Sequence, residues 1–213
     1  SLIIAHRGGA AVAPENTMAA FERAIADGAD WIELDVQENA DGDVIVEHDE
    51  DFMRVGGVPL RVWQATHEDL ATLDIGSSFA PEYMDQRVPT LRQVLDLAKG
   101  RIGVVIELKY YGHAVALERK VVDLVEATGT EDQIVIMSLN YDAVRKVKNM
   151  RPEWTCGLLN SVAIGDLTGL DVDFLAITGK EATWGTSRRA HRRGLKVFAW
   201  TIDEPAQMSA MIS

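Results

Sequence analysis

The sequence predicts an α/β fold of the TIM (β/α)8 barrel type, and three observations point to it. Short apolar runs recur at regular spacing, and most lack polar alternation, as strands covered on both faces do. Segments with helical periodicity separate these runs, which favours a parallel sheet with right-handed crossovers. Polar residues follow the C-terminal ends of several runs, whereas "HRGGAAVAPENT" lacks the G-x-G-x-x-G spacing of a dinucleotide-binding sheet.

The apolar runs cover residues 2–6, 30–36, 43–49, 102–109, 133–139, 154–159, 173–178 and 195–200. We count about seven of them as barrel strands, whereas a complete barrel has about eight. The chain stops inside the pattern of the helix that would follow the seventh strand. We therefore expect the eighth strand to be missing from this sequence.

Helical periodicity covers residues 15–28, 89–100, 113–129, 141–152, 187–194 and 204–212. Asn16 is the expected N-cap of the first helix, and Asp203 is the expected cap of the last. Thr90 and Gln93 have the spacing of a capping box. Glycine or proline ends most of these segments, as is typical of helix C-termini.

Residues 49–89 interrupt the strand–helix rhythm. This segment is too long for an ordinary connection and too rich in aromatic and aliphatic residues to be disordered. We interpret it as an insertion after the second strand that packs over the barrel mouth and could act as a lid or specificity wall. The alternative is a loop without function. Trp63, Phe79 and Tyr83 are candidates for shaping a pocket from this segment.

Composition limits the possible functions. A chain of 213 residues fits one large domain, so we expect residues 1–213 to form a single catalytic domain. The net charge of −12 argues against a nucleic-acid binder, which needs a basic face. Cys156 is the single cysteine and is expected to be a small buried apolar residue. No apolar stretch is long enough to span a bilayer and no signal peptide opens the chain, so a cytoplasmic location is expected. Because the sequence begins without methionine, an upstream membrane anchor is an open alternative.

Charged residues sit inside two of the predicted strands. Glu33 and Asp35 alternate in "WIELDV", and Glu107 follows in "VVIELK". Residues i and i+2 of a strand share a face, so these carboxylates could converge on one point and repel each other. A hard divalent cation, Mg²⁺ or Ca²⁺, would offset that repulsion with all-oxygen ligands. Structural salt bridges are the alternative, but the repetition on two strands favours the metal.

Two histidines and two basic residues end strands at the same predicted rim. His6 follows "LIIA" and His48 follows "VIVE", and together they could form an acid–base pair because imidazole titrates near neutrality. The other histidines, His67, His113 and His191, are weaker candidates. Arg7 and Lys109 add positive charge, which with a divalent cation suits a phosphoryl group.

These residues form a recognisable pattern. It consists of His6-Arg7-Gly8, Pro14-Glu15-Asn16-Thr17, Glu33-Leu34-Asp35, His48-Asp49, Glu107-Leu108-Lys109 and Trp200-Thr201. The pattern resembles that of the glycerophosphodiester phosphodiesterase family, in the same order and from Leu2 to the end of the chain. The segment around Arg54 also resembles the insertion of that family.

The resemblance implies a TIM barrel of the phospholipase C-like phosphodiesterase type and metal-dependent hydrolysis of glycerophosphodiesters to glycerol 3-phosphate and an alcohol. It assigns the metal to Glu33, Asp35 and Glu107, and acid–base catalysis to His6 and His48. It further assigns phosphate binding to Arg7 and Lys109, orientation of Arg7 to Glu15, capping of the first helix to Asn16 and the glycerol pocket to Trp200. The sequence departs from the family at its missing C-terminal end.

Two other functions remain as alternatives. A phospholipase D of the sphingomyelinase type looks similar at the barrel rim, although those relatives are usually disulfide-bonded. A non-catalytic module could bind metal and phosphodiester without turnover, but binding alone needs no pair of histidines. The alcohol moiety, the choice between Mg²⁺ and Ca²⁺ and the oligomeric state are not determined by the sequence.

Overall fold

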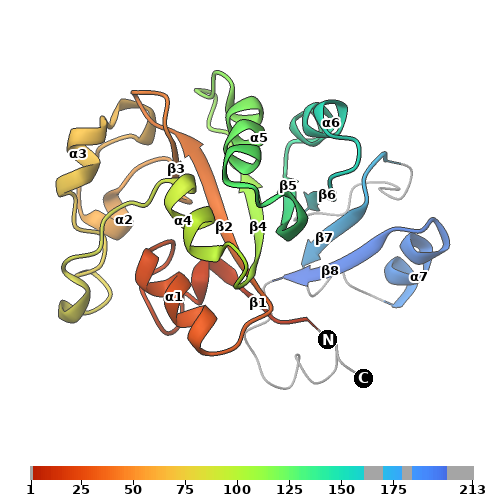
Figure 1. The fold of residues 1–213 in the computed structure, drawn as a ribbon, viewed down its shortest axis with the longest axis horizontal. Helices are drawn as coiled ribbons and strands as arrows, with labels where there is room; N and C mark the ends of the chain where they lie inside the picture. Colours follow the sequence, from red (N-terminus) through yellow and green to blue (C-terminus); the bar gives the residue numbers. More distant parts are fainter. Residues whose placement is uncertain (1, 161–169, 179–183, 201–213) are drawn as a thin grey trace. The chain divides into compact units, whose positions relative to one another are not determined.

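The computed structural model describes residues 2–160, 170–178 and 184–200 (Figure 1). The chain divides into two compact units with a boundary between Val135 and Ile136. The predicted helix at 204–212 and its cap Asp203 lie outside the described residues.

The N-terminal unit contains three parallel strands, β1 (Ile4–Ala5), β2 (Trp31–Glu38) and β4 (Gly103–Leu108), with β2 paired to both of the others. The registers Ile4↔Trp31 and Asp35↔Glu107 fix which side chains are neighbours. Every residue of β2 after Trp31 is buried, as expected of a strand covered on both faces.

One predicted strand runs in the opposite direction. β3 (Val44–Val46) is antiparallel to β2, with Val36 opposite Val46 and Glu38 opposite Val44. The two strands are joined by a tight turn in which Gly42 adopts φ 82°. The sequence predicted no helix between these two strands, and the structure joins them as a hairpin outside the parallel set. His48 consequently approaches the end of β2 on a returning chain.

Three helices cover this sheet segment: α1 (Met18–Ala26), α4 (Leu91–Ala98) and α5 (Leu117–Thr128). The starts of α1 and α5 differ from those predicted, and that of α4 agrees. The capping box of Thr90 and Gln93 is confirmed. The cap of α1 is Thr17, whose hydroxyl accepts from the Ala20 amide, so the prediction of Asn16 was wrong. α5 begins at Leu117 instead of near residue 113.

The late start of α5 has a cause in a contact with β2. The amides of Val115 and Ala116 donate to the buried Glu38 carboxylate, with the Val115 nitrogen 2.5 Å from Oε2. These bonds hold residues 113–116 in a loop, which places His113 before the helix. Glu38 thus satisfies two backbone amides directly before the helix, and no side chain of the described residues caps its first turn.

The inserted segment contains short helices: α2 (Met53–Gly56), η2 (Val62–Gln64), α3 (His67–Thr72) and η3 (Pro81–Tyr83). A separate hydrophobic cluster fixes the segment; its buried members are Ile45, Phe52, Val55, Val62, Ala65, Leu70, Ile75 and Val88. Ile45 belongs to β3, so the cluster joins the insertion to the hairpin. The ring of Trp63 stacks on the ring of His113 with centroids 3.7 Å apart.

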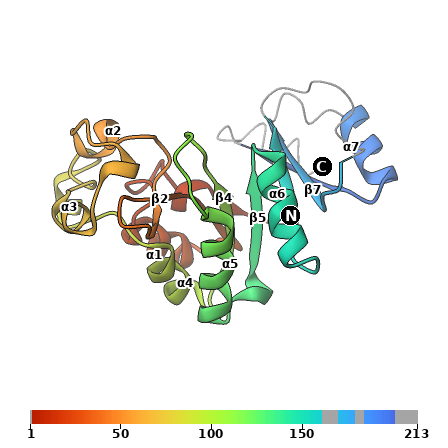
Figure 2. The ribbon, with the colours of Figure 1, turned by 90° about the horizontal axis from the view of Figure 1, so that it is seen from above.

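The C-terminal unit continues the strand–helix pattern. After η4 (Glu131–Gln133), the strands β5 (Ile134–Ser138), β6 (Cys156–Asn160), β7 (Phe174–Thr178) and β8 (Lys196–Trp200) pair in parallel in that order. α6 (Tyr141–Met150) packs on β6 and α7 (Trp184–Arg192) packs on β8 (Figures 1 and 2).

Two further expectations are met within the described residues. Among the described residues, β1, β2 and β4 pair in parallel in the first unit, and β5, which crosses the unit boundary, begins a second parallel set with β6, β7 and β8. The total of seven agrees with the count from the sequence. Cys156 is fully buried, and burial raises the pKa of its thiol to about 12, which suits an inert core residue. Among the helices of this part of the chain, none is both long and apolar enough to cross a membrane.

Candidate active site

Three buried carboxylates converge at the C-terminal ends of β2 and β4. Glu33 and Asp35 alternate on β2, and Glu107 of β4 lies in register opposite Asp35. Each residue offers one carboxylate oxygen, and these oxygens all lie within 4.8 Å of one another. The side-chain alternation of two paired parallel strands produces this convergence, which agrees with the prediction from the sequence.

The cluster is electrostatically unfavourable by itself. Burial and the charges of Asp35 and Glu107 raise the pKa of Glu33 well above its usual value. Burial and the Asp35 charge likewise raise the pKa of Glu107 to about 7, although Lys109 acts against the shift. Oδ1 of Asp35 and Oε1 of Glu107 are buried, and both face the Lys109 ammonium without a well-directed hydrogen bond. Such oxygens fit a hard divalent cation, so the three carboxylates could hold a metal ion.

The positive charges of Lys109 and Arg7 neutralise only part of the negative charge of these three carboxylates. The Lys109 Nζ lies 2.9 Å from Glu107 Oε1 and 3.5 Å from Asp35 Oδ1. The Arg7 Nε lies 3.4 Å from Asp35 Oδ2. The salt bridges considered as an alternative to a metal therefore exist at Asp35, but two cations face three carboxylates.

A left-handed turn carries His6 and Arg7 into the site. It forms η1 (His6–Gly8), in which Arg7 adopts φ 50° and Gly8 adopts φ 79°. A Cβ on Gly8 would lie 2.8 Å from that of Ala20, so the turn packs on α1 only with glycine there. The turn directs the Arg7 amide to Glu33 Oε2 at 3.0 Å, and His6 Nε2 lies 3.9 Å from the same oxygen.

Asn16 has a different role from the one predicted. It adopts φ 54°, its amide donates to the Arg7 carbonyl at 2.9 Å, and its Nδ2 donates to Asp35 Oδ2 at 3.0 Å. Asn16 thus positions a site carboxylate, while its neighbour Thr17 caps the helix. Glu15 accepts from Arg7 Nη1 at 2.9 Å, which agrees with the expected contact.

The hairpin returns His48 to the C-terminal end of β2. The amide of Glu47, the residue before it, donates to the Asp35 carbonyl at 3.0 Å. Nδ1 of His48 lies 2.7 Å from Asp49 Oδ1, and the carbonyl of His48 accepts from the Tyr111 hydroxyl at 2.8 Å. Sequence reasoning did not assign Asp49 a role beyond its place in the motif. Its position directly after a candidate histidine was the available signal.

The structure thus places eight of the nine predicted site residues in the N-terminal unit: His6, Arg7, Glu15, Glu33, Asp35, His48, Glu107 and Lys109. Trp200 ends β8 in the other unit, and its side chain lies outside what the structure describes.

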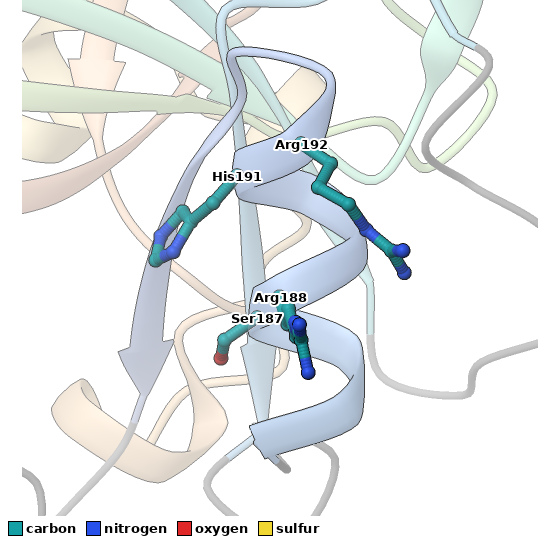
Figure 3. Close-up of a pocket in the computed structure, with 4 residues that line it drawn as sticks. All are labelled: Ser187, Arg188, His191 and Arg192. Atoms are coloured by element: carbon teal, nitrogen blue, oxygen red, sulfur yellow. The ribbon is translucent and has the colours of Figure 1, made fainter.

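The weaker candidates lie elsewhere. His67 is highly exposed beside Asp43, and His113 stacks on Trp63. His191 lies on α7, where it lines a pocket with Ser187, Arg188 and Arg192 (Figure 3). That pocket contains none of the predicted site residues.

Comparisons with known proteins agree on one family. The sequence profile of the glycerophosphoryl diester phosphodiesterase family matches residues 6–213. A glycerophosphodiester phosphodiesterase of Caldanaerobacter subterraneus is 33% identical, covering 100% of this chain and 90% of the relative.

Solved structures give the same result. A phosphodiesterase of Oleispira antarctica, in complex with its product sn-glycerol-3-phosphate, is 27% identical with a TM-score of 0.92, covering 100% of this chain and 89% of that one. A glycerophosphodiester phosphodiesterase of Agrobacterium tumefaciens is 30% identical with a TM-score of 0.86, covering 100% and 92%. These likenesses confirm the predicted fold class.

Proposed function

This chain belongs to the glycerophosphoryl diester phosphodiesterase family, and from this premise we propose that it hydrolyses glycerophosphodiesters to glycerol 3-phosphate and an alcohol. Membership makes it a phosphoric diester hydrolase. The observation that carries the proposal is the convergence of Glu33, Asp35 and Glu107 beside Arg7 and Lys109, because a phosphodiester needs several positive charges around its non-bridging oxygens. We infer that residues 1–213, with the insertion at about 49–89, act as one catalytic domain.

The three carboxylates would hold one divalent cation, Mg²⁺ or Ca²⁺, and when bound it supplies positive charge to the phosphoryl group. Arg7 and Lys109 bind phosphoryl oxygens in this proposal, and Glu15 fixes the Arg7 guanidinium. Trp200 lines the glycerol pocket by analogy with the family.

His6 and His48 provide acid–base catalysis in this scheme. One imidazole removes a proton from the nucleophile, either water or the 2-hydroxyl of the glycerol moiety. The other donates a proton to the leaving alkoxide, which departs poorly as an anion at neutral pH. With the 2-hydroxyl as nucleophile the first product is a cyclic phosphate, and a water molecule then opens its ring to give glycerol 3-phosphate. A carboxylate partner such as Asp49 suits a general base because it fixes the orientation of the ring.

The direct test is release of glycerol 3-phosphate from glycerophosphocholine with Mg²⁺ or Ca²⁺ and again after EDTA. We expect activity that EDTA abolishes and added metal restores. Cleavage of lysophosphatidylcholine or sphingomyelin alone would favour the lipid phosphodiesterase alternative. Saturable binding of glycerophosphocholine without product would favour the binding module.

The histidines can be tested singly. His6→Ala and His48→Ala should each lower kcat by about 10²-fold or more, which is the usual effect of removing an acid–base group. His67→Ala is the matched control, since its imidazole is 77% exposed and lies beside Asp43. Loss of less than about tenfold at both His6 and His48 would refute this assignment.

A further inference from the structure

One arginine of the insertion contacts the carboxylate partners of two proposed site residues. Arg54 lies on α2, and its Nε donates to Asp49 Oδ2 at 2.7 Å. Its Nη1 and Nη2 donate to the two oxygens of Glu15 at 2.6 and 2.8 Å. A single guanidinium therefore bridges two carboxylates that lie far apart in the sequence.

Each of these carboxylates also forms a hydrogen bond with a proposed site residue. Oδ1 of Asp49 lies 2.7 Å from Nδ1 of His48, and Oε1 of Glu15 also accepts from Nη1 of Arg7 at 2.9 Å. The contacts form a continuous series from His48 through Asp49, Arg54 and Glu15 to Arg7. The acid–base candidate and the phosphate-binding candidate are thus joined through one side chain of the insertion.

We propose that Arg54 is a positioning residue, which fixes the orientation of the His48 imidazole through Asp49 and of the Arg7 guanidinium through Glu15. This inference rests on the proposed function of His48 and Arg7. It gives the insertion a definite task, because α2 delivers the group that orders the site.

The chemistry of the groups supports this role. Partial burial tends to raise the pKa of Glu15 and of Asp49, but the hydrogen bonds from Arg54 lower both, so each carboxylate is ionised. An ionised Asp49 only accepts, so Nδ1 of His48 carries the hydrogen of their bond and Nε2 is left for proton transfer. The rigid guanidinium fork can hold three oxygens at once, which the ammonium group of lysine does with less directional control.

A purely structural role is the competing explanation, and the chain offers a matched control. Arg54 is 48% exposed, and ion pairs at such positions contribute little to stability. Arg61 lies in the same inserted segment, is 38% exposed and also pairs with two carboxylates, Glu50 and Asp51. Neither of these two carboxylates is the one that contacts His48 or Arg7.

Kinetics with chemical rescue separates the two explanations. We expect Arg54→Ala and Arg54→Lys to lower kcat by between about 10-fold and 100-fold, the usual effect of losing a group that orients a site residue. Arg61→Ala should retain the parent kcat. Millimolar guanidinium should restore part of the kcat of Arg54→Ala, because the vacated position is open to solvent, and should not affect Arg61→Ala. Equal losses in the Arg54 and Arg61 variants, without rescue, would overturn the proposal.

A spectroscopic readout needs no turnover. In ¹⁵N-labelled protein, the His48 ring should carry its hydrogen on Nδ1, and Arg54→Ala or Arg54→Lys should redistribute it between the two nitrogens, whereas Arg61→Ala should not. If the parent releases no glycerol 3-phosphate but the His48 signals move, the proposed function fails and the positioning role holds. If the His48 signals are the same in the parent and both Arg54 variants, the positioning role is wrong.

Discussion

At the scale of single residues, Glu33 and Asp35 show how a buried strand tolerates like charges on one face. Asp35 accepts from Asn16 and lies near Arg7 and Lys109, while Glu33 accepts from the Arg7 amide. These contacts reduce the repulsion without cancelling it, as the raised pKa of Glu33 indicates, with burial as its main cause. A bound cation would relieve the repulsion that remains between these carboxylates.

Glu47 provides a test of buried charge outside this cluster. Burial raises the pKa of its carboxyl to about 8, from 4.5 for an exposed glutamate. Between these two values the folded chain keeps a proton that the unfolded chain has released, so the free energy of unfolding falls as pH rises. Within that pH range, Glu47 lowers the free energy of unfolding by about 1.4 kcal/mol per pH unit. The loss of stability is complete once the pH exceeds the pKa of Glu47 in the folded chain.

We therefore expect Glu47→Gln to gain stability relative to the parent as the pH is raised from 5 to 8. Glutamine keeps an oxygen that can accept from the Asp49 amide, so the native contact is retained. Urea unfolding of both proteins in EDTA, at several pH values, measures the difference. If the free energies of unfolding of the two proteins change in parallel between pH 5 and 8, Glu47 is already ionised in the folded chain and its pKa is not raised.

At the scale of secondary structure elements, close contacts decide how strands pair. In the C-terminal unit, Gly157 of β6 lies beneath the ring of Phe174 on β7, and a Cβ there would approach ring carbons to 2.2 Å. The Phe174 ring is itself held edge-on by Phe198 of β8, with centroids 4.9 Å apart. The ring therefore has little freedom to yield.

Gly157→Ala should accordingly destabilise the protein by about 1–3 kcal/mol, the usual cost of overpacking a core. Phe174→Leu alone should also destabilise, because it leaves a cavity. The double variant should be more stable than the sum of the two losses predicts, since the smaller side chain accommodates the new methyl group. Strictly additive losses in thermal or urea unfolding would mean that the two residues do not compete for space.

At the scale of the whole molecule, the candidate site depends on segments that are distant in sequence. Its residues come from η1, β2, the end of β3 and β4, and the insertion adds contacts through Asp49 and Arg54. Ligand binding to such a site stabilises the folded chain, because the unfolded chain cannot assemble it.

We expect Mg²⁺ or Ca²⁺ at about 100 times its dissociation constant to add about 2.7 kcal/mol of stability, which for a chain of this length raises Tm by about 5–10 °C. Glu33→Gln combined with Glu107→Gln should abolish this increase, and it should raise the Tm measured in EDTA by removing repulsion. Differential scanning calorimetry with and without metal measures both effects. An equal metal-dependent increase in the variant would place the cation elsewhere.

The α/β class, the seven parallel strands and the convergence of the three carboxylates were predictable from the amino-acid sequence alone. Each follows from a local rule: apolar runs mark buried strands, and the two-residue period of a strand places Glu33 and Asp35 on one face. The capping box at Thr90 was equally predictable, because its residues lie three apart in the chain.

Other features depend on contacts that form only in the folded chain. The partner of Asn16 and the start of α5 each depend on a group distant in sequence, Asp35 and Glu38 respectively, and the direction of β3 depends on its pairing with β2. The bridge from Arg54 to Glu15 spans 39 residues and has no local signal. Local patterns fix which residues are buried and in what rhythm, but hydrogen bonds between distant segments form only once the fold brings those segments together.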